Sequence, residues 1–565
     1  MGSLLTVPFI TVAAWCQVPN TPNTNFDPRD LFPEQPEQPW PNAPEIPEQQ
    51  LQVPALPPVV PQSQPSTLQQ VVVDRFEVRG NTALRRNDLD EKLKKFYGQS
   101  LSIVELQQAA ILVTQLYVEK GFITSGAFVP ANQEQYSSEN RTIVLQAIEG
   151  RAKVKVQVQG GNLEAGYVES RLNLATTTPF NVETIETALK QLQLDLNIDV
   201  IQAELAEAPE TGLSILNVIV TPSDRFSAST FTNNNRSPSV GSEGVGTGLN
   251  IQNASGWGDS LSISPSFTDG SNSLNFSYTL PVSPHNTTVY ANGGIGHSTI
   301  IEEPFDRLDI QSSSRYFNLG LRHPLKQTPT ETIALSLELS HSRSQTTLLD
   351  IPFPLSPGAD LQGRTRVSAI RLGQDWTTQG EDFLFAVRSR FSLGLDLFEA
   401  TINETSPDSH FFSWQGQAQW VKLLGKETKL IVRGEAQLSD RPLLSGEQFG
   451  LGGQNTIRGY RQNALLTDNG LLGSAELYLP VLKIGAEAWL VELIPFFNIG
   501  TGWNSGESDQ PETQTLISIG SGLRLSLSDV FSARLDWGIP LVNLSDTNET
   551  WQENGLYFQL LYSPF

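Results

Sequence analysis

Beyond residue 222 the chain is a succession of short segments in which apolar and polar side chains alternate, and helical spacing disappears. Clear examples run from Ile333 to Leu339, from Phe391 to Leu397 and from Phe531 to Ile539. In each, every second side chain is apolar, and those between are small, polar or charged. Successive side chains of a strand point to opposite faces of its sheet. The pattern therefore predicts strands with one apolar and one polar face.

Two architectures fit such strands. A soluble β-sandwich would bury the apolar faces in a core, whereas a membrane barrel would turn them to lipid and line a wet interior with the polar faces. The region is long for one sandwich, and its turn clusters recur at intervals of about 20 residues, as in membrane barrels. It closes on an aromatic-rich segment ending at Phe565. Since bacterial barrels have even strand numbers, we expect a transmembrane antiparallel β-barrel of about 16 strands over residues 223–565.

Two small α+β units are predicted before the barrel. Residues 70–150 have the pattern of a strand, two helices and two strands, and the second helix opens with Ser102 and Glu105 at capping-box spacing. Residues 151–222 repeat this order. With no convergent titratable cluster in either, both are expected to be interaction modules.

The first 69 residues have a different composition. Residues 1–18 hold an apolar run that is too short for a membrane helix and is typical of a signal peptide, although a basic start is missing. Residues 19–69 contain 14 prolines and are predicted to be an extended linker. Cys16, the single cysteine of the chain, excludes an internal disulfide.

Composition also narrows the function. A net charge of −23 argues against a nucleic-acid partner, which would need clustered Lys and Arg. Five histidines and one cysteine form no metal-binding pattern, and no catalytic triad, phosphate-binding loop or dinucleotide fingerprint is present. The sequence therefore predicts no enzyme, no cofactor and no metal site.

One connection stands out. Residues 439–469 separate two alternating segments and contain GGQNTIRGY at Gly452 to Tyr460. Connections this long within a domain are usually functional or disordered. Glycines 452, 453 and 459 fit a hairpin that packs closely inside a lumen, because glycine accepts positive φ and close backbone approach; the alternative is a flexible tip.

Five stretches together resemble a known family. They are FEVRGNT at Phe76, LYVEKGF ending at Phe122, VQGGN at Val158, GWGDS at Gly256 to Ser260, and GGQNTIRGY. The combination is similar to the outer-membrane transporters of two-partner secretion, of the haemolysin-activator type. The two modules resemble the polypeptide-transport-associated (POTRA) domains of that family. The resemblance implies a pore in the outer membrane, with its modules in the periplasm, that exports a large partner protein.

The same resemblance implies a site. In the family, the loop folds into the lumen and its arginine meets an acid in the strand pattern Phe-x-Asp-x-Gly. Here the arginine is Arg458 and the acid is replaced by Asn498, a weaker acceptor that would hold the arginine more loosely. Glu476, on the polar face of its strand, is expected to compensate, so we predict that Arg458 contacts Glu476, Asn498 or both. The loop residues implicated are Gly452, Gly453, Ile457, Arg458, Gly459 and Tyr460, and those of the strands are Glu476, Phe496, Asn498 and Gly500.

The expected partners are a secreted client protein, the lipid bilayer and the barrel-assembly machinery, which would contact the C-terminal strand ending at Phe565. Two other functions stay open at this point. An outer-membrane protein insertase of the same superfamily usually has a different number of modules, and a diffusion porin has none.

Overall fold

The computed structural model describes residues 70–130, 142–425, 427–485, 489–506, 513–528, 530–544 and 550–564. The predicted signal peptide, the proline-rich linker and Phe565 lie outside these residues. In the described part of the chain, no helix is long and apolar enough to cross a membrane.

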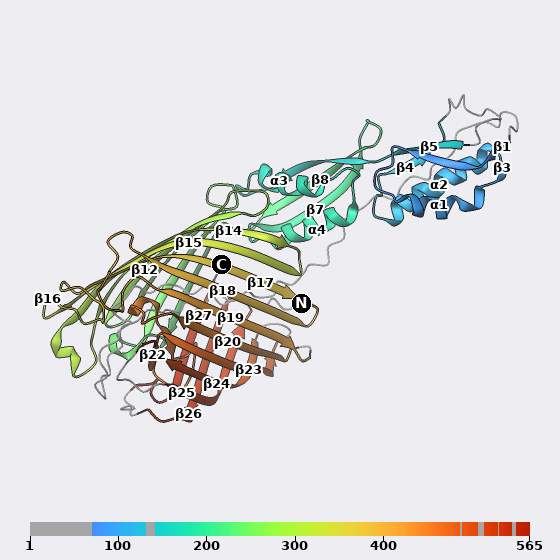
Figure 1. Ribbon diagram of the computed structural model, residues 1–565. Coiled ribbons are helices and arrows are strands. Elements are labelled where there is room, and N and C mark those ends of the chain that lie inside the picture. The colour runs from blue at the N-terminus through green and yellow to red at the C-terminus, as the bar shows by residue number, and fades with distance from the viewer. Residues whose placement is uncertain are drawn as a thin grey trace. The chain divides into compact units, whose positions relative to one another are not determined.

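The first module contains a three-stranded sheet and two helices (Figure 1). In the sheet, β5 (Thr142–Ile148) is central, parallel to β2 (Arg75–Arg79) and antiparallel to β4 (Gly126–Phe128). A separate two-stranded antiparallel sheet is formed by β1 (Val71–Val73) and β3 (Gln99–Leu101). The helices are α1 (Arg86–Leu93), continued by the 3-10 turn η2 (Lys94–Phe96), and α2 (Ile103–Glu119). The predicted capping box of α2 is confirmed, because Ser102 Oγ accepts from the backbone of Glu105, and the Glu105 carboxylate accepts from the backbone of Ser102.

The second module repeats the first. Its elements are β6 (Arg151–Val158), α3 (Ala165–Ala175), α4 (Val182–Gln193), β7 (Ile198–Glu207) and β8 (Leu213–Pro222). The last strand is again central, parallel to the first and antiparallel to the one before it. Each module has its own apolar core, around Tyr117 in the first and Phe180 in the second, and both side chains are fully buried.

Sixteen long antiparallel strands then close into a barrel, as predicted, within the described residues (Figure 1). In chain order they are β9 (Phe226–Asn233), β10 (Gly244–Gln252), β11 (Ser260–Phe267), β12 (Ser271–Pro281), β13 (Thr288–Thr299), β14 (Ile310–Gln327), β15 (Glu331–Leu348), β17 (Arg364–Gln379), β18 (Phe383–Leu395), β19 (Phe412–Leu423), β20 (Lys429–Ser439), β23 (Asn469–Ile484), β24 (Trp489–Trp503), β25 (Gln514–Leu527), β26 (Phe531–Pro540) and β27 (Leu556–Tyr562). A two-residue strand, β16 (Ile351–Pro352), extends the connection between β15 and β17.

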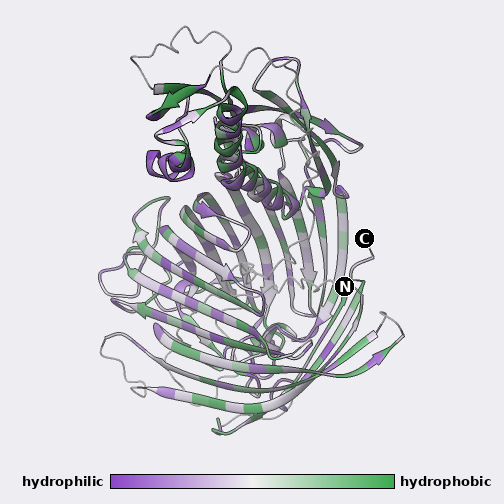
Figure 2. Ribbon diagram, turned by 90° about the vertical axis from the view of Figure 1, so that its right-hand side faces the viewer, coloured by the Kyte–Doolittle hydropathy of each residue, from purple (hydrophilic) through white to green (hydrophobic). Residues whose placement is uncertain are grey.

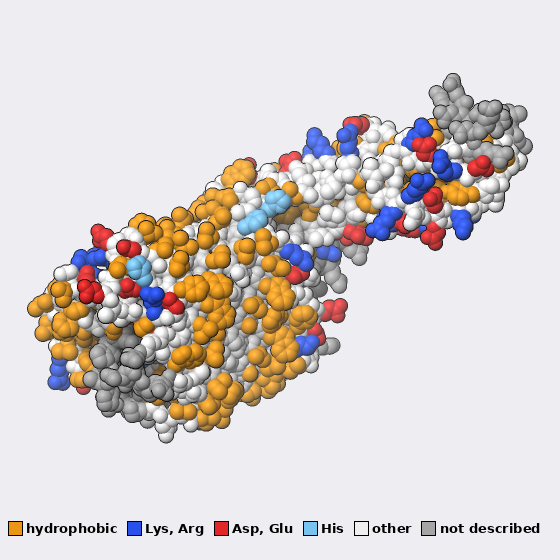
Figure 3. Space-filling model, viewed as in Figure 1, with side chains coloured by type: hydrophobic (Ala, Val, Ile, Leu, Met, Phe, Trp, Pro, Cys, Tyr) orange, Lys and Arg blue, Asp and Glu red, His pale blue; other side chains and the backbone are white. Residues whose placement is uncertain are grey.

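The apolar faces of these strands look outward, as a membrane barrel requires. Along β15, Leu337 is 54% exposed, whereas Ser340, on the opposite face of the strand, is 4% exposed. Green and paler or purple segments alternate along the barrel strands in Figure 2. In Figure 3 hydrophobic side chains cover much of the visible barrel wall. This orientation of the apolar faces is opposite to that in a soluble β-sandwich, where they would be buried in the core.

The two ends of the barrel differ in their connections. At one, here called the turn end, short turns such as 328–330 and 380–382 join the strands. At the other, the loop end, connections such as 300–309, 349–363 and 396–411 are long. β9 starts at the turn end, directly after β8 in the chain, and β27 finishes there. Pairing of β27 with β9 closes the barrel.

Candidate functional site

The connection of residues 439–469 fills part of the barrel interior. It leaves β20 at the loop end and contains the 3-10 turn η5 (Ser445–Glu447) and a small hairpin of β21 (Phe449–Leu451) and β22 (Leu465–Thr467). Leu451 and Ile457 are fully buried and pack with Tyr460 and with Leu516 of the wall. The loop is therefore folded, with an apolar core of its own, and is neither an extended nor a solvated tip.

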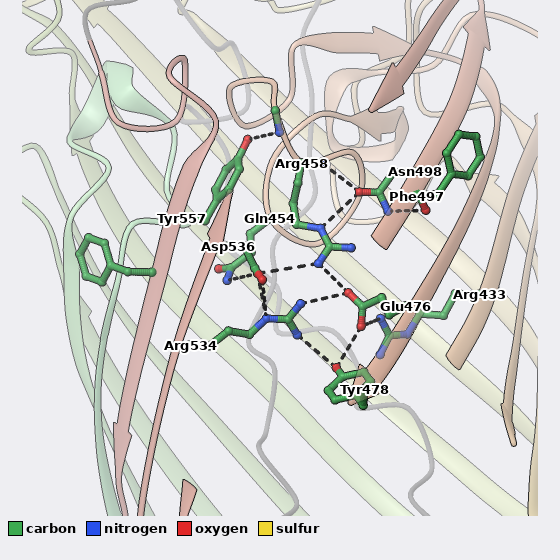
Figure 4. Close-up of polar contacts among 12 residues, drawn as sticks. Arg433, Gln454, Arg458, Glu476, Tyr478, Phe497, Asn498, Arg534, Asp536 and Tyr557 are labelled. Carbon is green, nitrogen blue, oxygen red and sulfur yellow. Dashed lines mark hydrogen bonds and ion pairs between the residues drawn. The ribbon is translucent and has the colours of Figure 1, made fainter. Parts of the chain in front are cut away.

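Arg458 projects from this loop to the barrel wall (Figure 4). Its Nη1 lies 2.6 Å from Glu476 Oε1 on β23 and 3.8 Å from Asp536 Oδ2 on β26. Asn498 Oδ1 on β24 accepts from Arg458 Nε at 3.2 Å and from its backbone N at 3.4 Å. The structure thus brings Arg458 to both residues considered from the sequence, and the negative charge that Asn498 lacks is supplied by Glu476 on β23 and Asp536 on β26.

The two carboxylates belong to a larger wall cluster. Arg534 on β26 donates to Asp536 from Nε at 2.8 Å and to Glu476 from Nη2 at 3.0 Å. On the other side Arg433 of β20 lies 3.6 Å from Glu476 Oε2. Tyr478 OH donates to Glu476 Oε2 at 2.9 Å. These interactions converge on Glu476, which is 2% exposed, so its charge is compensated from three directions (Figure 4).

Two further residues of β24 shape the pocket for the loop. The Arg458 guanidinium lies over the Phe496 ring, 3.5 Å from its centroid, a cation–π geometry. A Cβ at Gly500 would come within 2.7 Å of the Ile457 Cδ1 atom, so glycine leaves the space that the isoleucine occupies. Phe496, Asn498 and Gly500, spaced by two residues along β24, therefore contact the loop from the same face of the strand.

Glycines allow the loop backbone to touch the wall. Gly459 has φ +101°, and a Cβ there would lie 3.2 Å from the carbonyl carbon and oxygen of Gly538 on β26. Conversely, a Cβ on Gly538 would lie 2.5 Å from Gly459 N. Gly452 and Gly453 have φ +114° and +101°. Both reasons considered for these glycines, positive φ and close approach, apply here.

Two tyrosines fasten the loop next to this contact. Tyr557 of β27, fully buried, accepts from Gly459 N at 3.0 Å and donates to the Tyr460 carbonyl at 2.5 Å. The Tyr460 hydroxyl lies 2.9 Å from the carbonyls of Ile517 and Val542. The aromatic residue of the signature thus bonds to backbone at the wall rather than to lipid or solvent.

The loop has two more ionic anchors. Glu447 receives two hydrogen bonds from Arg371 of β17, at 2.6 and 2.9 Å. Arg461 binds Glu302 through both terminal nitrogens, at 3.1 and 2.8 Å, and lies 3.1 Å from Glu553. These carboxylates come from the connections β13–β14 and β26–β27, so the loop is held by the wall and by neighbouring loops.

The sequence analysis placed Arg458, Glu476 and Asn498 in one site, but it did not identify Asp536, Arg534, Tyr557 or the Arg371–Glu447 pair as parts of it. Alternation alone puts Asp536 and Arg534 near the lumen, since the segment was recognised as a strand. The alternation pattern does not tell where β26 lies around the barrel relative to β23. In the described ranges no group of three His, Cys, Asp or Glu side chains is placed to hold a metal ion.

Comparison with protein-family models gives two matches. The model described as haemolysin secretion/activation protein ShlB/FhaC/HecB matches residues 212–525, more than half of the chain. The model of the POTRA domain, ShlB-type, matches residues 71–150.

Individual relatives agree. The heme/hemopexin transporter protein HuxB of Haemophilus influenzae is 22% identical over 506 residues, which cover 84% of each protein. The outer membrane transporter CdiB of Escherichia coli is 22% identical over 491 residues, or 83% of this chain and 79% of that protein. The solved structure of CdiB from Escherichia coli has a TM-score of 0.67 at 21% identity and covers 90% of this chain and 93% of that one. The fold and the family matches confirm the resemblance found in the sequence, and the chain belongs to the haemolysin secretion/activation family, the outer-membrane transporters of secreted partner proteins whose POTRA domains lie in the periplasm.

Proposed function

We propose that this transporter conducts its partner protein through the barrel interior, and that the loop of residues 439–469 is a stopper that must move first. The observation that carries the proposal is the ion pair of Arg458, 3% exposed, with Glu476 inside the lumen. A loop that is docked by its own core, three sets of ion pairs and backbone contacts occupies the route that an extended chain would take.

The charges of the wall cluster allow the stopper to leave and return. With Arg458 in place, three guanidinium groups face the two carboxylates Glu476 and Asp536. Without it, Arg433 and Arg534 still balance both carboxylates. Removing one partner of a buried pair is costly chiefly when it leaves an unpaired charge. Within this cluster, withdrawal of the loop therefore leaves only Arg458 without its partner, and Arg458 can be hydrated as it moves.

In this proposal the two modules bind the partner protein before it enters the barrel. In each sheet the last strand is central and two strands are edges, β2 and β4 in the first module and β6 and β7 in the second. An extended polypeptide can add to such an edge through backbone hydrogen bonds. The cargo is proposed to be a large protein that folds after it emerges, since folding outside would supply the direction of transport. HuxB and CdiB are named as transporters, which is consistent with a cargo of this kind.

The sharpest experiment compares two arginines of the same cluster. Arg458→Ala removes the arginine of the loop, whereas Arg433→Ala removes one that touches the same carboxylate from the wall. Both variants are expected to assemble, as judged by heat-modifiable mobility on gels. We expect only R458A to increase ion conductance through the reconstituted barrel and to alter export of the partner protein. An assembled R458A with wild-type conductance and export would refute the stopper.

The C-terminal strand is proposed as the contact for the barrel-assembly machinery. β27 ends at Tyr562, close to the end of the chain, and presents a short aromatic-rich segment at the turn end. Deleting Phe565 is expected to lower the amount of assembled barrel in cells without affecting synthesis. Undiminished assembly of that variant would count against this contact.

A further inference from the structure

A row of arginines crosses three neighbouring strands on the outer face of the barrel. In the strand register, Arg315 of β14 is directly opposite Arg343 of β15, and Arg343 is directly opposite Arg366 of β17. Neighbouring strands lie about 4.8 Å apart. Like charges placed directly opposite each other destabilise a sheet unless something neutralises them. The row therefore needs an explanation outside the fold.

The side chains of this row point away from the lumen. Arg315 has the same phase as the exposed Phe317 and Leu319, while the residues between them, such as Tyr316, are buried in the interior. Arg343 likewise alternates with Ser344, which is 2% exposed and bonds within the barrel. The arginines thus share the face of the lipid-contacting residues, not the face of the wet interior.

The row lies where the apolar band stops. Four residues closer to the turn end on each of the same three strands are Leu319, Leu339 and Ile370, which lie directly opposite one another. Between the two rows come Phe317 and His341, again opposite each other. The arginines thus follow immediately on lipid-facing side chains, toward the loop end. In Figure 3 blue, red and pale-blue side chains gather near the left end of the barrel, next to hydrophobic surface.

Protein carboxylates neutralise only one side of the row. Arg366 lies 3.8 Å from Asp360 and 3.6 Å from Glu399, both on connections of the loop end, and Asp360 also pairs with Arg364 at 2.9 Å. In the part of the chain that the structure describes, neither Arg315 nor Arg343 has an ion-pair partner. Two adjacent guanidinium groups are thus left facing the membrane boundary.

We propose that Arg315 and Arg343 bind the anionic headgroup of a lipid in the outer leaflet. Guanidinium groups bind oxyanions such as phosphate in bidentate geometry, and two adjacent ones can share a headgroup. The apolar band below the row gives the acyl chains of the same lipid a surface to lie on. At the loop end, which faces outward when the modules are periplasmic, the leaflet in reach is the outer one.

The test counts lipids retained by the full-length protein. The protein is reconstituted in nanodiscs of phosphatidylcholine with a minor fraction of phosphatidylglycerol, and bound lipid is measured by native mass spectrometry after release. The wild type is expected to retain phosphatidylglycerol in preference to phosphatidylcholine. A basic residue near an anionic headgroup contributes enough that R315Q/R343Q should bind phosphatidylglycerol about 30-fold more weakly. R315K/R343K, which keeps both charges, should retain much of the binding.

The matched control removes two positive charges from the turn end. Lys326 and Lys422 are paired with Glu331 and Asp382 respectively, so K326Q/K422Q has the same net charge as the glutamine variant but leaves the row intact. Heat-modifiable mobility establishes that each variant has a closed barrel. Equal retention of phosphatidylglycerol by R315Q/R343Q and the wild type would overturn the proposal. Equal loss in K326Q/K422Q, or no preference over phosphatidylcholine in the wild type, would also overturn it.

Discussion

At the scale of single residues, docking of the loop on the barrel wall depends as much on glycines, which have no side chain, as on charged residues. Gly459 and Gly538 let two backbones meet, and a side chain on either would intrude on the other. The ion pair of Arg458 with Glu476 can form at 2.6 Å only because the loop comes this close to the wall.

Gly538→Ala should therefore displace the loop without changing a charge. Its Cβ would lie 2.5 Å from Gly459 N, so backbone must shift, at a cost of about 1–3 kcal/mol for an overpacked position. We expect faster hydrogen exchange of the loop amides around Arg458 and higher conductance. Gly434→Ala, on strand β20 of the same barrel, is the control, because its Cβ would meet no atom closer than 3.8 Å. Wild-type exchange in G538A would contradict this account.

Residue-level prediction from sequence reached part of the site. The phase of Glu476 within its alternating strand and the motif around Arg458 suffice to place the two side chains on the same side of the wall. The phase of Asp536 puts it in the lumen as well, but periodicity holds no information on which strands face one another. Its approach to within 3.8 Å of Arg458 is a property of the closed barrel.

At the scale of elements, the loop is a small folded unit held at separate points. Alternation predicts the strands on either side of it, and its length indicates a functional role, but the hairpin of β21 and β22 is too short to leave a periodic signal. The anchor of η5 is likewise invisible in the sequence, because Arg371 and Glu447 are 76 residues apart.

Weakening the Arg371–Glu447 pair should increase the mobility of only the N-terminal part of the loop, residues 443–451. Glu447→Gln keeps the shape of the side chain but removes its charge, and Arg371 retains Ser340, Ser392 and the more distant Glu338. A charge-assisted hydrogen bond contributes about 1.5–3 kcal/mol. Hydrogen exchange should quicken in residues 443–451 while the amides around Arg458 stay protected. Uniformly faster exchange would indicate that the loop moves as one body.

The first module is expected to lose stability in acid through Glu149. Burial by itself raises the pKa of this carboxyl, but hydrogen bonds from Thr82, Ala83 and Tyr117 outweigh it and hold the pKa below its usual 4.5. A lowered folded-state pKa gives a stabilisation that is complete above the unfolded value and disappears as the pH falls through the folded one.

Glu149→Gln tests this linkage. The variant should lose about 1–2 kcal/mol of module stability at neutral pH and show a flatter dependence below pH 4.5. In the described residues all α-helices belong to the modules, so denaturant unfolding followed by helical circular dichroism reports on them within the full-length protein. An unchanged slope with pH would show that Glu149 is not the titrating group.

At the scale of the whole molecule, the barrel depends on the meeting of its two terminal strands. β27 pairs with β26 over seven residue pairs but with β9 over four, from Gln559 opposite Asn233 to Tyr562 opposite Thr230. Asn234 reinforces this seam, because its Oδ1 accepts from Phe558 N at 2.8 Å and its Nδ2 donates to the Leu556 carbonyl at 2.9 Å.

A chain that ends before Leu556 should not form a stable membrane barrel. Its β9 and β26 would expose unpaired backbone groups to hydrocarbon, at several kcal/mol for each group. Loss of heat-modifiable mobility on gels is the expected result. Deleting residues 70–222 instead removes the modules but leaves all sixteen strands, so that variant should still show the mobility shift.

The bond between Phe558 and Asn234 joins residues 324 positions apart, so the ring is completed only when the last strand has been made and delivered. Until then every intermediate carries two bare edges, and the nascent protein needs a holder on its way across the periplasm. The diameter of the pore is likewise fixed when β27 pairs with β9, because the number of strands determines the width of a barrel. A pore of this type is therefore built to be either absent or full-sized.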